Sequence, residues 1–270
     1  MSIQPGGRTM SDDSERLELH QFPYSHYNEK VRWALDFKSV PHRRISYLPG
    51  PHMTALRKLA GTSATPVLRV GGVVVAGSAE IIDVLEGQYP EPPLYPADPG
   101  QRRAALDLQD FFDEEVAAAV RRALFAELLQ EPAYLCRLFA SEKPLLTRLA
   151  YRAMQPAIRP VMRHMMQIDS EHLGTARHTI RAALDRVAAQ AGPDGYLVGG
   201  RFSIADLAAA ALLAPACDVS HPDMALPAPR PARVAAWFAE WAAHPGTAWV
   251  RSIYEKHRPC RVLPLRAAAD

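Results

Sequence analysis

Short apolar runs alternate with segments of helical period over the first third of the chain. The strand-like runs span residues 17–20, 43–48, 66–70 and 73–76, and several of them are rich in β-branched residues. Apolar positions recur at helical spacing over 28–37, over 53–59 and around Ile81, Ile82 and Leu85. Gly71-Gly72 between the last two runs is typical of a hairpin. The order β-α-β-α-β-β-α predicts an α/β sandwich.

The remainder of the chain has a different pattern. Five prolines between 90 and 99, without any helical or strand period, indicate a linker. Helical patterns then cover 102–130, 134–168, 172–190, 204–214 and 234–243. Pro144, Pro156 and Pro160 predict that the second of these segments is broken or kinked.

We therefore expect a thioredoxin-like α/β domain followed by an all-α helical-bundle domain. The expected boundaries are a flexible tail over 1–15, the first domain over 16–89, a linker over 90–100, the helical domain over 101–258 and a C-terminal tail over 259–270.

Composition and charge exclude several classes of protein. Hydrophobic residues make up 48% of the chain and charged residues 22%, which is typical of a globular protein. The formal charge of +2 gives no electrostatic support for nucleic-acid binding. The first 15 residues are polar and lack a secretory signal, and no run is long enough to span a membrane. Three scattered cysteines fit a reducing compartment, so we expect a cytoplasmic protein without a nucleic-acid or membrane partner.

Two groups of helical side chains could bind a ligand or could serve only the fold. Arg148, Arg152, Arg159 and Arg163 fall near one helical face, and the balanced total charge favours a solvated face over a site for an acidic ligand. Core packing is similarly the preferred interpretation of Met162, Met165 and Met166 over the lining of a pocket. His172 and His178 do not share a helical face, and we expect no metal site.

The segment from Phe22 to Arg32 holds the main candidate chemistry. It follows a strand and opens a helix, so a hydroxyl there lies beside unpaired backbone N–H groups and the positive end of the helix dipole. Anions, including thiolates, are stabilised in such a position. For Ser25 taken alone, capping of the helix is the competing interpretation.

Three further motifs follow in order along the chain. They are Ala64-Thr65-Pro66-Val67-Leu68, Gly77-Ser78-Ala79-Glu80 and Ser203-Ile204-Ala205-Asp206. Ser78 is an N-cap by residue type and could offer its hydroxyl to a carboxylate, and the last motif is a capping box. Together with the first segment, in this order and spacing, they resemble the glutathione transferase family over about residues 16–258. The resemblance implies an active site in the cleft between the two domains.

Under this resemblance, Ser25 matches the catalytic Ser or Cys of zeta- and omega-like members. Its hydroxyl would donate a hydrogen bond to the thiolate of bound glutathione. A charge-assisted hydrogen bond of about 1.5–3 kcal/mol lowers a thiol pKa by about one to two units. Tyr24, whose phenol is also a good donor, is the second candidate for this role.

The resemblance also implies contacts with the rest of the tripeptide. The backbone of Thr65, beside a cis Pro66, would pair with the cysteinyl part, and Ser78 would take the γ-glutamyl carboxylate. His52 stands at about the position of a basic residue that meets the glycyl carboxylate in omega-like members; an ordinary surface histidine is the alternative.

The chain departs from the family pattern at three places. The loop before the first helix has no Cys, so mixed-disulfide chemistry is not expected. Gly77 stands where the family usually has Glu or Asp to bind the γ-glutamyl ammonium, and Glu80 is the candidate to compensate. Residues 131–169 are longer and more proline-rich than a typical helical domain, and could enlarge or cover the acceptor pocket.

The predicted function is that of a glutathione transferase-like enzyme, usually a homodimer by family analogy, that adds the glutathione thiolate to an electrophilic, apolar small molecule. Isomerisation, dehalogenation and ether cleavage use the same thiolate and stay open. Phe111, Phe112 and Tyr134 are the candidate walls of the acceptor pocket. The alternative is a non-catalytic, transferase-like binding or scaffold protein, which Gly77 favours.

Overall fold

The computed structural model describes residues 17–258, and the predicted tails, 1–15 and 259–270, lie outside this range. A four-stranded sheet has the order β2-β1-β3-β4, formed by β1 (Leu17–Gln21), β2 (Arg43–Ser46), β3 (Val67–Val70) and β4 (Val73–Ala76). β1 pairs in parallel with β2 and antiparallel with β3, and β3 pairs antiparallel with β4. Gly71 and Gly72 both have positive φ, as their tight hairpin requires.

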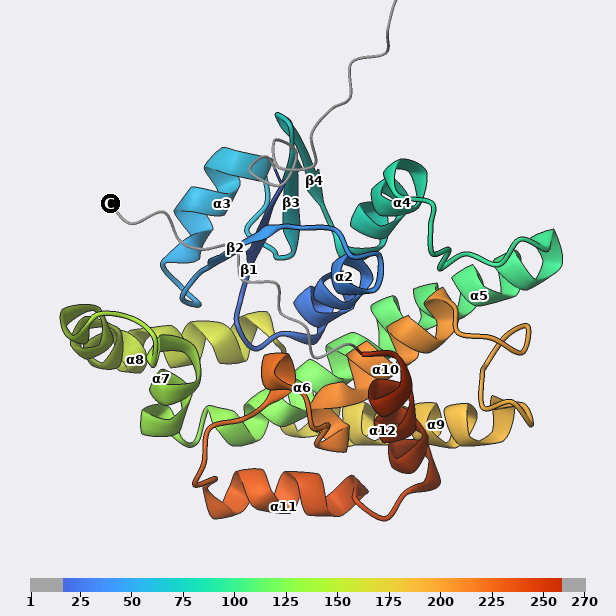
Figure 1. The fold of residues 1–270 in the computed structure, drawn as a ribbon. Helices are drawn as coiled ribbons and strands as arrows, with labels where there is room; N and C mark the ends of the chain where they lie inside the picture. Colours follow the sequence, from blue (N-terminus) through green and yellow to red (C-terminus); the bar gives the residue numbers. More distant parts are fainter. Residues whose placement is uncertain (1–16, 259–270) are drawn as a thin grey trace, which may run out of the picture.

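Three helices complete the first domain. Figure 1 shows α2 (His26–Phe37) and α4 (Ser78–Gln88) on one side of the sheet and α3 (His52–Ala60) on the other. Apolar side chains of β1, α2 and α4 form the core between the sheet and these two helices, among them Leu19, Val31 and Ile81, all fully buried. These elements match the predicted β-α-β-α-β-β-α order, so the thioredoxin-like part of the fold prediction is confirmed.

The second domain is helical, and residues 89–98 before it contain no helix or strand. Its elements are α5 (Pro99–Phe111), a π-helical turn (Phe112–Val116), α6 (Ala117–Leu128), α7 (Pro132–Ala140), α8 (Leu145–Met165), α9 (Ser170–Gln190), α10 (Ile204–Cys217), a 3-10 turn (Pro222–Met224), α11 (Ala232–Trp241) and α12 (Pro245–His257). The predicted all-α domain is thus confirmed, while the π-helical turn, the 3-10 turn and α12 were not anticipated.

Helix α10 is the centre of the helical domain. Every residue from Ile204 to Cys217 is buried, as its nearly uniform apolar sequence predicts. Its first turn is closed by the predicted capping box. The Asp206 carboxylate accepts a hydrogen bond from the Ser203 backbone N–H, and the Ser203 hydroxyl oxygen accepts one from the Ala205 backbone N–H. α10 also packs directly against α2, so the helix that follows Ser25 rests on the centre of the second domain (Figure 1).

The predicted break within 134–168 is confirmed, but only Pro144 accompanies it. The break falls at residues 141–144, between α7 and α8, and α8 then continues through Pro156 and Pro160. A proline within a helix leaves the carbonyl four residues before it without its usual donor. Arg152 and Pro156, whose carbonyls are affected, are exposed residues, so water can solvate them.

A buried cluster of ion pairs begins at Glu29 in α2. The Glu29 carboxylate accepts hydrogen bonds from Arg32 Nε at 2.9 Å and from Arg258 Nε at 2.8 Å, and all three side chains are fully buried. Burial alone raises the pKa of a carboxyl group, but Arg258 and Arg32 hold the pKa of Glu29 below its usual range. Glu29 is therefore an anion whose partners come from α2 and from the residue after α12.

The same cluster extends to the edge of the sheet. Arg258 also pairs with Asp36 at 2.7 Å and with Asp223 at 2.8 Å. Arg44, on β2, pairs with the same two carboxylates at 3.2 and 2.8 Å. Three carboxylates and three arginines thus balance in charge, and they connect α2, β2, the 3-10 turn and the end of α12.

Removing one member of this cluster should be costly. We expect Arg258→Met to lower the free energy of unfolding by about 3–5 kcal/mol, because it leaves one buried carboxylate without a compensating charge. The stabilisation from Glu29 is present above the unfolded pKa of about 4.3 and is lost as pH falls through its lower folded pKa. Urea unfolding at a series of pH values measures both effects.

The control is Arg43→Met. The Arg43 side chain is 66% exposed and pairs with Glu18 only at 4.0 Å, so its loss should cost about 1 kcal/mol or less. Equal losses in the two variants at neutral pH would contradict the role given to the buried cluster.

Candidate active site

Ser25 is the N-cap of α2. Its backbone is extended, and its Oγ accepts a hydrogen bond from the Asn28 backbone N–H at 3.5 Å. The capping interpretation is therefore correct for the oxygen. Because a hydroxyl accepts through lone pairs and donates through its hydrogen, the O–H of Ser25 is still available to a ligand. Ser25 is half-buried and lies in the wall of a pocket between the two domains.

The residues on either side of Ser25 remain uncharged. Burial raises the pKa of Tyr24 far above its usual range, and burial lowers the pKa of His26 to about 3 with a further contribution from Arg121. His26 Nε2 lies 3.0 Å from the Ala117 carbonyl oxygen, so that nitrogen carries the proton and donates. Both side chains line the pocket, Tyr24 as a neutral phenol that can donate and His26 as a neutral imidazole.

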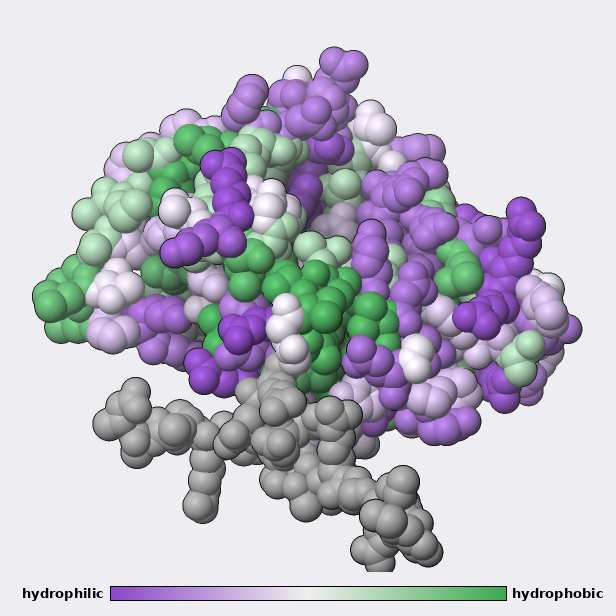
Figure 2. Space-filling view, turned by 90° about the horizontal axis from the view of Figure 1, so that it is seen from above, coloured by the Kyte–Doolittle hydropathy of each residue, from purple (hydrophilic) through white to green (hydrophobic). Residues whose placement is uncertain are grey.

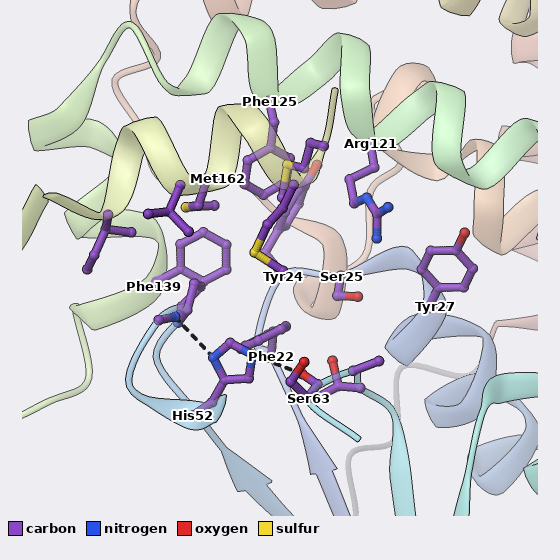
Figure 3. Close-up of a pocket in the computed structure, with 18 of the residues that line it drawn as sticks. Phe22, Tyr24, Ser25, Tyr27, His52, Ser63, Arg121, Phe125, Phe139 and Met162 are labelled. Atoms are coloured by element: carbon purple, nitrogen blue, oxygen red, sulfur yellow. Dashed lines mark hydrogen bonds between the residues drawn. The ribbon is translucent and has the colours of Figure 1, made fainter. Parts of the chain in front are cut away.

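The pocket is a mostly apolar cavity of about 420 Å³. Figure 3 shows Phe22 and Tyr24 from the first domain facing Phe125 of α6, Phe139 of α7 and Met162 of α8. Further apolar walls come from Leu124, Ile158, Val161, Met165 and Met166. Met162, Met165 and Met166 thus line the pocket, against the preferred interpretation that they serve core packing alone.

The predicted acceptor walls are wrong. Neither Phe111, Phe112 nor Tyr134 lines the pocket. Phe112 is fully buried in the core, and Phe111 packs edge-on against it beneath the guanidinium of Arg186. The Tyr134 hydroxyl donates to the Pro227 carbonyl at 2.8 Å, on the side of α7 away from the cavity.

His52 and Thr65 line the pocket near Ser25, and both have partners in the protein. His52 Nδ1 accepts from the Gly50 N–H at 3.0 Å and Nε2 donates to the Ser63 carbonyl at 3.0 Å (Figure 3). Burial lowers the pKa of His52, so it is a neutral ring with no free N–H for a carboxylate. Thr65 Oγ1 accepts from Asn28 Nδ2 at 3.1 Å, and the Thr65–Pro66 bond is cis, as the resemblance implied.

Ser78 and Glu80 lie at the start of α4, beyond the residues that line the pocket. The buried Ser78 hydroxyl donates to Asp113 Oδ1 at 3.4 Å, and Asp113 also forms an ion pair with the buried Lys30 of α2. Tyr27 donates to the Asp113 backbone carbonyl at 3.1 Å. Asp113, in the π-helical turn, therefore joins α2 and α4 from the second domain.

Glu80 occupies the space beside Gly77. A Cβ atom added at Gly77 would overlap the Oε2 atom of Glu80 and lie 2.7 Å from its Cδ. Gly77 has a φ of +104°, a backbone conformation that residues other than glycine rarely adopt. The Glu80 carboxylate therefore lies beside Gly77, three residues before it in the chain.

Arg121 brings a positive charge to the Ser25 end of the pocket. Figure 3 shows its side chain reaching from α6 toward the start of α2, where Ser25 and Tyr27 lie. Its guanidinium carbon lies 5.9 Å from the centre of the Tyr27 ring, and its buried Nε has no hydrogen-bond partner within the described part of the chain. The sequence offered only a weak signal for Arg121, a pair of arginines, Arg121 and Arg122, within an apolar stretch of helix.

Glu29, His221 and Asp223 bring three potential metal-ligand atoms within 4.8 Å of one another. The carboxylates of this trio already pair with arginines of the buried cluster, which is typical of a structural ion-pair site.

Over residues 17–258, no helix is long and apolar enough to cross a membrane.

Two family models match the chain. Residues 19–93 match the N-terminal domain of glutathione S-transferase, and residues 144–240 match the C-terminal domain. Together the two segments cover most of the chain, and the first contains Ser25, the cis proline and Ser78. The two matches fall in the two structural domains described above.

Curated relatives match over a shorter stretch. The chain is 34% identical over 102 residues to glutathione S-transferase 1 of Dianthus caryophyllus, which covers 37% of this chain and 45% of the relative. It is 34% identical over 90 residues to the maleylpyruvate isomerase of Ralstonia sp, covering 32% and 42%. The chain thus spans less than half the length of these relatives.

Solved structures match over nearly the whole chain. A glutathione S-transferase of Methylobacterium radiotolerans, in complex with glutathione sulfonate, has a TM-score of 0.54 at 22% identity, covering 94% of this chain and all of that one. A glutathione transferase of Phanerochaete chrysosporium has a TM-score of 0.59 at 20% identity, covering 92% and 99%. At these identities the likeness concerns the fold.

The packing of Glu80 against Gly77 can be tested by unfolding. We expect Gly77→Ala to lower the free energy of unfolding by about 1–3 kcal/mol through its backbone conformation, plus the cost of displacing Glu80. Gly72→Ala is the matched control, since Gly72 has a φ of +103° with no atom near its Cβ position. The excess cost at Gly77 should vanish in a Glu80→Ala background; equal costs in all cases would contradict the arrangement.

Proposed function

Because the chain belongs to the glutathione transferase family, we propose that it activates the thiolate of bound glutathione for attack on an electrophilic, apolar small molecule. The observation that carries the proposal is the position of Ser25. Its hydroxyl caps α2 and lies in the wall of an apolar cavity between the two domains. A sulfur bound there would meet a hydroxyl donor, the helix N-terminus and an apolar chamber for the second substrate.

The local electrostatics favour a bound anion. The first N–H groups of a helix and its dipole stabilise negative charge, and Arg121 adds a full positive charge at the same end of the pocket. Tyr24 stays protonated, so its O–H is available to donate. Ser25 would act by stabilising the thiolate, and its own oxygen need not attack the substrate. Tyr24 remains the second candidate for this role.

Residues between Thr65 and Glu80 would bind the remaining part of glutathione. Thr65, next to the cis proline, is held against α2 by Asn28 and would offer its backbone to the cysteinyl part. The start of α4, with Ser78, would bind the γ-glutamyl carboxylate. Glu80, exposed and folded over Gly77, would bind the γ-glutamyl ammonium. His52 would contribute shape, since both its ring nitrogens are occupied.

The acceptor would occupy the apolar cavity beneath α7 and α8. Its walls of Phe, Leu, Ile and Met favour a compound with substantial apolar surface. Conjugation, isomerisation, dehalogenation and ether cleavage all begin with the same thiolate. One relative is named a maleylpyruvate isomerase, so isomerisation stays within the proposal beside conjugation.

The alternative is a transferase-like binding protein without catalysis, which the absence of an acidic residue at Gly77 favours. The placement of Glu80 over Gly77 returns a carboxylate to that position and supports the enzyme. The two candidates differ in turnover: a scaffold would leave every electrophile unreacted even where glutathione binds.

Ser25→Ala should raise the thiol pKa of bound glutathione by about one to two units, because it removes one charge-assisted hydrogen bond. The rate constant kcat/KM with a chlorodinitrobenzene should fall about ten- to one hundred-fold at neutral pH. Ultraviolet absorbance of the thiolate against pH measures the first effect, and a conjugation assay measures the second. Tyr24→Phe is the parallel variant; a pKa shift in Tyr24→Phe and none in Ser25→Ala would transfer the role to Tyr24.

Calorimetric titration tests where glutathione binds. Ser78→Ala should weaken binding at least about ten-fold, because a buried hydroxyl that meets a charge contributes about 1.5–3 kcal/mol. Glu80→Gln should weaken binding several-fold and Glu255→Gln, exposed on α12, should not change it. No binding by the unaltered protein at several millimolar glutathione would contradict the proposal and favour the scaffold.

A further inference from the structure

Helix α8 is buried along only one narrow stripe. Its buried residues are Tyr151, Gln155, Ile158 and Met162. At about 100° per residue these positions fall within about 60° of arc, so most of the helix surface faces outward. A helix held on one stripe normally carries polar residues on the remainder.

The open surface of α8 is instead rich in large apolar side chains. Over residues 17–258, seven large hydrophobic side chains are exposed, and six of them lie on α8. They are Leu145, Leu146, Leu149, Met154, Val161 and Met165, with exposed fractions between 45% and 81%. Figure 2 shows hydrophobic side chains at the left edge of the molecule, where α8 begins in Figure 1. Apolar exposure concentrated on one element marks an interaction surface.

The same helix carries only positive charge. Residues 143–168 contain Lys143, Arg148, Arg152, Arg159 and Arg163 and no Asp or Glu, although the whole chain has nearly equal numbers of both signs. The four arginines fall within about 60° of arc, on the flank next to the exposed leucines. α8 therefore presents an apolar surface bordered by a row of guanidinium groups.

This combination fits one kind of partner. Apolar side chains of an interfacial helix enter the boundary of the acyl chains, while arginines reach anionic headgroups with their long side chains. A second copy fits less well, because a symmetric contact through α8 would bring two sets of four arginines together. We propose that α8 docks this protein onto the surface of a bilayer containing anionic lipids.

The proposal departs from the expectation that the protein has no membrane partner. That expectation was drawn from the absence of a span, and docking by α8 needs none. Val161 and Met165 belong both to the exposed surface and to the pocket wall. If the proposed function holds, an apolar acceptor dissolved in the bilayer would reach the pocket beside α8.

Vesicle flotation of the full chain without glutathione tests the docking by itself. We expect binding to vesicles of phosphatidylcholine with phosphatidylglycerol, weak binding to phosphatidylcholine alone, and loss of binding as salt rises. Leu145→Glu should weaken binding about ten-fold, and each arginine of the row changed to Gln about five-fold. Val73→Glu is the matched control, since Val73 and Leu145 are both 64% exposed and Val73 lies on the distant β-hairpin.

Circular dichroism of each variant establishes that it is folded. The variants of Arg148, Arg152 and Arg163, at exposed positions, provide a second route if Leu145→Glu fails to fold. Absence of binding to the anionic vesicles at low salt would overturn the proposal. An equal loss in Val73→Glu and Leu145→Glu would do the same. A concentration-dependent dimer that Leu145→Glu dissociates would assign the surface to a second copy instead. None of these outcomes depends on glutathione, so the proposed function stands or falls separately.

Discussion

The position of the candidate active site depends on the buried ion-pair cluster beneath α2. Ionised side chains in an apolar interior are tolerated only with compensating partners, so each member of the cluster constrains the others. Glu29 begins the cluster one turn after Ser25, and its partner Arg258 follows the last helix of the second domain. The hydroxyl that caps α2 is thus held in place by residues more than two hundred positions away, and the two domains share one electrostatic requirement.

The segment from α7 to α8 turns the cleft into an apolar chamber. Lys143, before α8, donates to the Ser46 carbonyl at the end of β2. The Ile158 side chain packs beside Gly50 in the first domain. The helical domain therefore reaches across the cleft and covers one side of it. Water that would solvate a thiolate and its substrate is partly replaced by Phe and Met side chains, which strengthens the interaction of an anion with the Ser25 hydroxyl and Arg121.

The sequence predicted what depends on local patterns and failed where two distant segments meet. Ser25 and Ser78 were found because helix starts have a recognisable chemistry, and the motif around Thr65 and Pro66 was found by resemblance. Phe111 and Phe112 were proposed as aromatic residues of the helical domain, without any pattern that shows which side chains of that domain reach the cleft. Phe112 lies in the core, whereas Arg121 and Phe125, further along, line the pocket. The hydrophobic pattern of one helix does not show which residues of another domain its side chains will face.

Glu80 places a carboxylate beside Gly77 although the sequence has no acidic residue at position 77 itself. Side chains in the first turn of a helix lean toward its N-terminus, so a glutamate at the third position of α4 can lie over the residue before the helix. Glycine at 77 provides the room, because any larger residue would collide with the Glu80 carboxylate. The carboxylate also stays beside the positive end of α4, where a negative charge is stabilised. Because a carboxylate lies beside Gly77, the glycine by itself is no argument that the site has lost its ligand.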